Sequence, residues 1–348
     1  MPIDRQIEQV FVKARTGAPH GSAEGLIDAA GPAAACSVGP DVAAVIDHSI
    51  DTLRRARRAR CYHPPVGIPG TAAMDGSSVR PAILYLPGDG APRQAADGQD
   101  ALCRRLAKAC RALVIVLDRQ GSRGGPGAEA RVATVPANTS NAQERLADAL
   151  ATVRWLRAHA VDLAIDPQRL AIAGEGTGAY LAVRTLIDLR EAGDPPLAMH
   201  VLISPVLDLV DLDGGEAPGW LAESAAGEAI DRHLAAVVQQ LRTWRDTAFA
   251  GAGPLDGPML SPMRATSLAG LPPAFVLSAG ADPLRGQAQR WVDRLHAAGI
   301  DSAHECFEGM VHGFVFMGPE VAGAGHAVAR MAQHLRPVLR SVLRHRFT

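Results

Sequence analysis

Short apolar runs alternate along the chain with stretches whose apolar residues recur at helical spacing. The runs have the length and composition of buried strands, and they lie at residues 82–86, 113–117, 170–173, 199–204, 273–279 and 302–307. Helical spacing is found at residues 100–109, 142–159, 179–189, 287–298 and 327–343. This alternation predicts right-handed crossovers, and therefore an α/β fold with a mostly parallel sheet covered by helices on both faces.

Two regions interrupt the alternation and predict a helical cap. Near the N-terminus one helix face carries Ile3, Ile7, Val10 and Phe11. Between the fourth and fifth runs there is no strand signal, and the apolar positions fit one helix: Ile230, Leu234, Val237, Val238 and Leu241. The predicted division is an N-terminal cap segment (1–50), the first part of the core (51–208), a cap insertion (209–257) and the second part of the core (258–348).

Two further stretches have a distinct character. Residues 52–62 are rich in arginine and carry no aromatic ladder, which favours an edge strand with solvated arginines over a site for a polyanion. Residues 121–141 run through Gly, Pro, Ala, Ser, Thr and Asn without any period. The sequence therefore predicts a long loop there, of the kind that is mobile or functional.

Composition narrows the function classes. The chain has 348 residues, 47% hydrophobic and 20% charged, with a formal net charge of −1. No overall field attracts nucleic acid or an anionic membrane, so we expect a small ligand of apolar or mixed polarity. Its five cysteines show no C-x-x-C pattern, and neither a secretory signal nor a membrane span is evident. These features predict a cytoplasmic protein with reduced thiols.

A glycine-dense turn joins the run at 170–173 to the following helix. Gly174-Glu175-Gly176-Thr177-Gly178 has the strand, tight turn and helix layout of the nucleophile elbow, G-x-S-x-G. The outer glycines occur where that turn needs small residues. At the central position, where the motif has serine, this chain has Gly176.

Further segments extend this pattern to nearly the whole chain. They are Leu202-Ile-Ser-Pro-Val-Leu-Asp208, Leu271-Pro-Pro-Ala-Phe-Val-Leu-Ser-Ala-Gly280, Asp282-Pro-Leu-Arg285 and Gly309-Met-Val-His-Gly-Phe314. With them the chain resembles the hormone-sensitive-lipase-like branch of the α/β-hydrolases, the bacterial esterases with H-G-G-G and G-D-S-A-G-G motifs. The resemblance implies the α/β-hydrolase fold with a helical cap, no cofactor, and often a homodimer through the last strand or helix.

The resemblance also implies roles for individual residues. Asp282 is expected to be the acid that orients His312, the general base, in the chain order of this fold. The H-G-G-G segment falls on Pro87-Gly88-Asp89-Gly90, and D-S-A-G-G falls on Glu175-Gly176-Thr177-Gly178-Ala179. The expected oxyanion hole and pocket residues are Gly88, Asp89, Gly90, Thr177 and Glu175. The segment D-Y-R-L-A-P-E-H is reduced to Asp118-Arg119-Gln120.

The departures bear directly on chemistry. Gly176 has no side chain to deprotonate, so no acyl-enzyme can form on it, and loss of such a serine costs on the order of 10⁶ in turnover. Asp89 places a carboxylate near the hole, which opposes an oxyanion by about 4 kcal/mol at about 4 Å and an effective dielectric near 20. That penalty matches the roughly 3 to 4 kcal/mol that one hole donor typically supplies.

Other interpretations of these residues stay open. Gly176 relieves backbone strain if serine is not needed, and Asp282 and His312 are then relics. Thr177 is a substitute nucleophile only if its hydroxyl does not cap the helix or face inward. The remaining histidines show no metal-ligand spacing, so no metal site is expected. The glycines also formally resemble a dinucleotide fingerprint, which the acid and histidine segments disfavour.

Three functions follow as hypotheses. The first is a small-molecule enzyme that uses His312 and Asp282 as a general-base dyad, for water activation, elimination or cyclisation. The second is a ligand-binding protein without catalysis, as in the plant gibberellin receptors that resemble this family. The third is a residual esterase in which water or another hydroxyl replaces serine.

Overall fold

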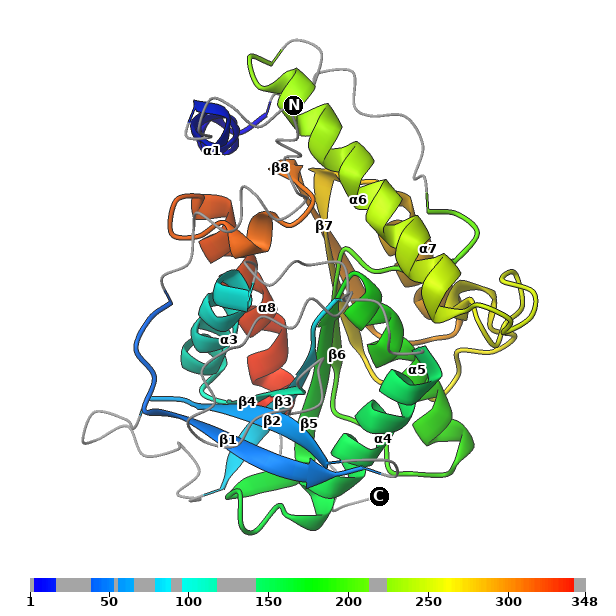
Figure 1. The fold of residues 1–348 in the computed structure, drawn as a ribbon. Coiled ribbons are helices and arrows are strands. Elements are labelled where there is room, and N and C mark those ends of the chain that lie inside the picture. Colours follow the sequence, from blue (N-terminus) through cyan, green and yellow to red (C-terminus); the bar gives the residue numbers. More distant parts are fainter. Residues whose placement is uncertain are drawn as a thin grey trace.

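The computed structural model describes residues 3–16, 39–52, 56–65, 79–88, 96–117, 142–212 and 224–340. Eight strands form one sheet in the order β1-β2-β4-β3-β5-β6-β7-β8 (Figure 1). Only the pairs of β2 with β1 and with β4 are antiparallel. The strands are β1 (Ala44–Asp51), β2 (Ala56–His63), β3 (Arg80–Leu86), β4 (Leu113–Leu117), β5 (Ile165–Glu175), β6 (His200–Ile203), β7 (Ala274–Ala281) and β8 (Ser302–Val311).

Helices cover both faces of the sheet, as the alternating pattern predicts. One face packs against α4, α5 and α7, through residues such as Val153 and Trp291, and the other against α3 and α8, through Leu106 and Met331. Figure 1 shows these two groups on opposite sides of the strands. The helices are α1 (Arg5–Thr16), α3 (Ala96–Cys110), α4 (Ala142–Ala158), α5 (Thr177–Glu191), α6 (Gly227–Ala248), α7 (Arg285–Ala297) and α8 (Ala322–Arg340), with 3-10 turns η3 (Pro262–Arg264) and η4 (Phe314–Phe316).

The start of the sheet differs from the sequence prediction. Residues 44–51 form β1, although the sequence pattern indicated no strand there, and β1 rather than β2 is the edge. The prediction of an arginine-rich edge strand is therefore wrong. Arg57 is 2% exposed and donates from Nε to Asp148 Oδ2 at 2.6 Å, whereas Arg60 is exposed and pairs with Asp47 on β1. Complementary carboxylates hold both arginines, and neither the partners nor the strand was visible from local pattern.

The two helices that the sequence assigns to a cap, α1 and α6, both form and touch each other, while their role as a cap stays a prediction. In α1 the residues Ile7 and Phe11 are fully buried, as the helix-face pattern predicts. Glu8 of α1 accepts hydrogen bonds from Ser224 Oγ at 2.9 Å and from Ala225 N at 3.0 Å, just before α6 begins. Segments more than 200 residues apart in the chain therefore form one unit at one end of the sheet (Figure 1). The predicted loop at 121–141 lies outside the described residues.

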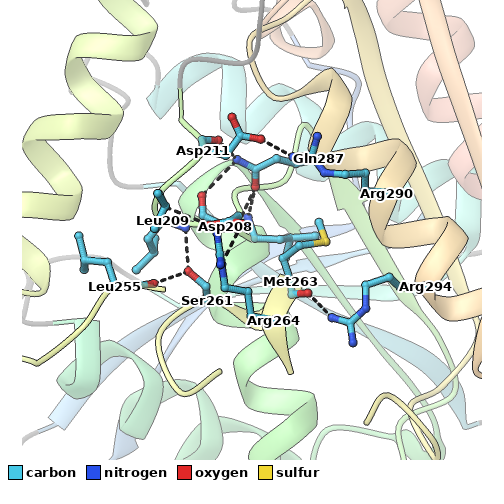
Figure 2. A network of polar contacts seen from close by, with 12 residues as sticks. Asp208, Leu209, Asp211, Leu255, Ser261, Met263, Arg264, Gln287, Arg290 and Arg294 are labelled. Carbon is cyan, nitrogen blue, oxygen red and sulfur yellow. Dashed lines mark hydrogen bonds and ion pairs between the residues drawn. The ribbon is translucent and has the colours of Figure 1, made fainter. Parts of the chain in front are cut away.

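A buried polar network anchors the segment that leaves β6 toward the cap (Figure 2). Gln287 of α7 is 1% exposed, and its Oε1 accepts from the backbone N–H groups of Leu207 at 2.6 Å and Asp208 at 2.8 Å. Its Nε2 donates to the carbonyl oxygens of Asp208 and Asp211. One amide side chain thus satisfies four backbone groups that the turn after β6 would otherwise bury unpaired.

We expect Gln287→Leu to lower the free energy of unfolding by about 2 to 4 kcal/mol, because it leaves two buried N–H groups without an acceptor. Urea unfolding at neutral pH measures the change. Gln239→Leu, on the exposed face of α6, is the matched control and should change stability by less than about 0.5 kcal/mol. Equal effects of the two substitutions would contradict the assigned role of Gln287.

Candidate functional site

At the turn between β5 and α5, the backbone of the turn lies in direct contact with the backbone at the end of β3 and with the start of α5. A Cβ on Gly178 would lie 2.0 Å from the carbonyl oxygen of Leu86 at the end of β3, and one on Gly174 would lie 2.5 Å from Gly178 O. Real side chains essentially never approach that closely. Only glycine fits at both positions, which explains the glycine spacing in the sequence.

Gly176 is the residue at the apex of this turn and directly precedes α5. Its backbone has φ 53° and ψ −116°, a conformation that favours glycine. Its N–H donates to Ile203 O at 2.9 Å, and its carbonyl accepts from Val206 N at 3.1 Å. No atom of another described residue, apart from the two chain neighbours, lies within 4 Å of the position that a Cβ on Gly176 would occupy. Within the described part of the chain, nothing fills the space at the apex, and Gly176 brings no functional group of its own.

Asp282 and His312 meet at the carboxyl ends of the last two strands. Asp282 follows β7 and His312 follows β8, and His312 Nδ1 lies 3.1 Å from Asp282 Oδ1. Because a carboxylate only accepts, Nδ1 carries the hydrogen. The other ring nitrogen, Nε2, has no hydrogen-bond partner within the described ranges. This is the orientation of the imidazole that general-base chemistry requires.

Two further groups fix the Asp282 carboxylate. The backbone N–H of Leu284 donates to Oδ1 at 2.8 Å, and Ser204 Oγ donates to Oδ2 at 2.5 Å. Ser204 follows β6 with φ 44°, an unusual value for a non-glycine residue. Since Ile203, its neighbour, bonds Gly176, the acid and the apex of the turn share one anchor. The segment Leu202–Asp208 carries the family resemblance, but its sequence alone does not assign Ser204 a role.

Charges explain the protonation behaviour of the pair. Burial opposes ionisation of both groups. For Asp282 the histidine charge and the hydrogen bonds from His312, Ser204 and Leu284 outweigh burial and lower its pKa. For His312 the charge and hydrogen bond of Asp282, with a further contribution from Glu175, outweigh burial and raise its pKa. The site therefore stabilises the imidazolium that a general base becomes after taking a proton.

The other predicted pocket residues fall into three groups. Glu175 Oε2 accepts from the Gly88 N–H at 3.0 Å, so this predicted oxyanion-hole donor is engaged by a carboxylate. Thr177 is 2% exposed and begins α5, consistent with the structural interpretation of its hydroxyl. Asp89 and Gly90 lie outside the described residues, and their contribution to a hole stays a prediction.

A histidine of the cap also reaches the site. His233 of α6 is 1% exposed, and its Nε2 lies 3.0 Å from the carbonyl oxygen of His312. Burial lowers the pKa of His233 to about 4. The sequence signal was available, because position 233 lies in the apolar helix face between Ile230 and Val237, where a polar residue needs a partner.

Metal ligands, membrane-spanning helices and cysteines were each considered in the sequence and can be compared with the described residues. No cluster of three or more potential metal ligands occurs among the residues described. None of the helices in the described part of the chain has the length and apolar character that crossing a bilayer requires. Cys61, Cys103, Cys110 and Cys306 are free thiols.

Comparison with known proteins decides the family. A model of the alpha/beta hydrolase fold matches residues 136–316, just over half of the chain. The chain belongs to the alpha/beta hydrolase fold family. It is 30% identical over 297 residues to Esterase LipI of Mycobacterium tuberculosis, an alignment that covers 85% of this chain and 82% of that protein.

Solved structures agree with the family and its architecture. A mutant of LAE6, an alpha/beta hydrolase enzyme from the metagenome of Lake Arreo, Spain, superposes with a TM-score of 0.70 at 26% identity, over 96% of this chain and 98% of that one. An esterase from the bacterial hormone-sensitive lipase family gives a TM-score of 0.67 at 22% identity, over 97% and 100% of the two chains. The predicted α/β-hydrolase fold is confirmed, and the relatives of this hydrolase-family protein are esterases.

The buried histidines predict a specific pH dependence of stability. His200 on β6 and His233 are both held neutral by burial, with pKa values of about 4 in the folded protein against 6.5 in the open chain. Between these values the unfolded chain binds more protons than the folded protein, so stability falls as the pH is lowered from about 6.5 to about 4. Each histidine contributes on the order of 3 kcal/mol to that loss.

The measurement is the urea midpoint across this pH range for the parent protein and for His233→Gln, which should show a shallower decline. His312 acts in the opposite direction. Because its folded pKa is raised, its contribution to stability is present below about pH 6.5 and lost as the pH rises through its folded pKa. A midpoint that stays level from about pH 6.5 to about pH 4 would refute the assignment of two buried neutral histidines.

Proposed function

We propose that this α/β-hydrolase is a cytoplasmic small-molecule enzyme in which His312 and Asp282 act as a general-base dyad without a covalent step. The proposal rests on one observation: the imidazole of His312 is oriented as a base, while the apex of the elbow has no nucleophile. His312 Nδ1 is bonded to Asp282, while the nucleophile position of the elbow is occupied by Gly176.

The reaction step follows from this arrangement. His312 Nε2 takes a proton from a water molecule or from an acidic position of the ligand. With water, the resulting hydroxide adds to an electrophilic carbon of the ligand, and a leaving group departs with the electron pair of its bond. With the ligand as proton donor, the electron pair left behind forms a double bond as a leaving group departs from the neighbouring atom, or in a cyclisation adds to an electrophilic double bond of the ligand, whose displaced electron pair takes up the returned proton. Asp282 stabilises the imidazolium until the proton returns to the product or to solvent. Acid–base help of this kind typically gives about 10²- to 10⁴-fold acceleration and needs no serine.

The space left by the missing side chain supports the same proposal. Since no described atom lies within 4 Å of the side-chain direction at Gly176, a water molecule or a ligand hydroxyl has room there. The cap helices α1 and α6 lie at this end of the sheet, which favours a small ligand of apolar or mixed polarity. Esterase activity through a substitute hydroxyl is the second candidate, and it is favoured by the similarity to Esterase LipI and to the carboxylesterase NlhH of Mycobacterium tuberculosis.

A turnover and binding screen tests the proposal. We expect p-nitrophenyl esters to be inert, and a non-ester ligand to raise the melting temperature and to be converted. His312→Ala should then lower turnover by about 10²- to 10⁴-fold while the thermal shift persists. His326→Ala is the matched control on an exposed position of α8 and should leave turnover unchanged.

The alternatives give different results in the same screen. Ester turnover that His312→Ala abolishes would support a residual esterase. A ligand that binds but is not converted by the parent protein would support a binding protein. Conversion that is equal in the parent and in His312→Ala would refute the dyad.

Restoring the serine tests the reason for its loss. Gly176→Ser should destabilise the fold by about 1 to 3 kcal/mol, because the apex keeps a positive φ. We expect little ester hydrolysis from this variant, because the sequence predicts that the Asp89 carboxylate lies near the hole and opposes the oxyanion. The double variant Gly176→Ser/Asp89→Gly should hydrolyse p-nitrophenyl acetate about 10²- to 10³-fold faster than Gly176→Ser. Equal rates would show that Asp89 does not oppose the oxyanion.

A further inference from the structure

We propose that His233 is a positioning residue that ties the cap to the general base, so that docking of α6 sets the place of His312. The proposal rests on the function proposed above for His312. It concerns a residue of the cap insertion, far from the acid and base segments in the chain.

The hydrogen bond between the two histidines runs from side chain to backbone. His233 Nε2 lies 3.0 Å from the carbonyl oxygen of His312. A carbonyl oxygen only accepts, so Nε2 carries the hydrogen and the imidazole donates. Burial keeps this ring neutral, because it lowers the pKa of His233 to about 4. The contact therefore persists over the whole pH range in which a histidine base works.

The cost of this arrangement argues against a purely packing role. The second ring nitrogen, Nδ1, is buried and has no hydrogen-bond partner among the residues described. An unpaired buried polar atom typically costs about 1 to 3 kcal/mol. A phenylalanine or leucine would fill the same place in the apolar face of α6 without that cost. What only the histidine provides is the donor to the backbone of the base.

Both halves of the cap converge on this contact. The ring of Phe11, from α1, meets the ring of His233 edge-on with centroids 5.3 Å apart. The start of α1 is itself tied to the last strand, since Asp4 N donates to Gly309 O at 3.0 Å, three residues before His312. The position of the base is thus fixed on one side by Asp282 and on the other by the cap.

The consequence is that movement of α6 is transmitted to the base. If the donor is removed, the backbone at His312 is held less firmly, and the bond from Nδ1 to Asp282 weakens. That bond is one of the causes that raise the pKa of His312, so its pKa should fall toward the ordinary value. Small displacements of a reacting group, on the order of 1 Å, can cost about 10²-fold in rate.

The test compares three variants that fill the same site differently. His233→Gln keeps a donor near the position of Nε2, His233→Asn is polar but too short to reach, and His233→Phe fills the space without a donor. Titration of the His312 imidazole by NMR in full-length protein is the first readout. We expect the pKa of His312 to fall in the Asn and Phe variants and to stay near the parent value in the Gln variant.

Turnover of the ligand found in the screen is the second readout. The Asn and Phe variants should lose about 10- to 100-fold in kcat with little change in KM, and the Gln variant less than about 3-fold. Phe11→Leu is the control for packing, because it loosens the same junction and leaves the hydrogen bond in place. It should lower stability without moving the pKa of His312.

Each outcome bears on the proposal separately from the proposed function. An unchanged pKa of His312 in both the Asn and Phe variants would overturn the positioning role. A shift of the same size in Phe11→Leu would also overturn it, because loosened packing alone would then account for the effect. If the pKa moves but no ligand is converted by the parent protein, the positioning role stands and the proposed enzyme fails.

Discussion

The close approach of three backbone segments at the β5–α5 turn is the constraint on which the site depends. The end of β3 at Leu86 lies against Gly178 in the first turn of α5, and Gly178 in turn lies against Gly174 at the end of β5. Neither glycine has room for a Cβ. This contact fixes where α5 begins relative to the sheet. It also places the apex residue, Gly176, in the unusual backbone conformation that lifts the position out of the sheet, with its N–H bonded to the neighbouring strand.

The proposed acid, Asp282, and the proposed base, His312, both depend on the same sheet. In an open parallel sheet the residues just beyond the carboxyl ends of the strands converge, and ligand sites form there. Asp282 after β7 and His312 after β8 converge in this way, and Ser204 after β6 completes the set by bonding the carboxylate. Strand order, rather than any local feature, brings residues from positions 204, 282 and 312 into one hydrogen-bonded chain.

Much of this was predictable, because the strands and helices of the core have clear apolar periods, and because the glycine, acid and histidine segments are specific. What escaped prediction depends on contacts that are distant in the chain. Strand β1 exists through pairing with β2, and Arg57 is buried through Asp148 of α4. The partners of Ser204 and His233 come from other elements. Local pattern marks His233 as a polar residue in an apolar helix face, but it identifies neither partner. Glu175 reaches Gly88 across 87 positions.

The central claim is that chemistry here proceeds without a covalent enzyme intermediate. The most direct test treats the protein with a serine-directed organophosphate and measures the mass of the intact protein by mass spectrometry. The turnover of the ligand that the protein converts is then measured with the treated protein. We expect an unchanged protein mass and undiminished turnover, because the apex offers no nucleophile. A stable adduct on Thr177 or on any other hydroxyl, together with loss of turnover, would contradict it.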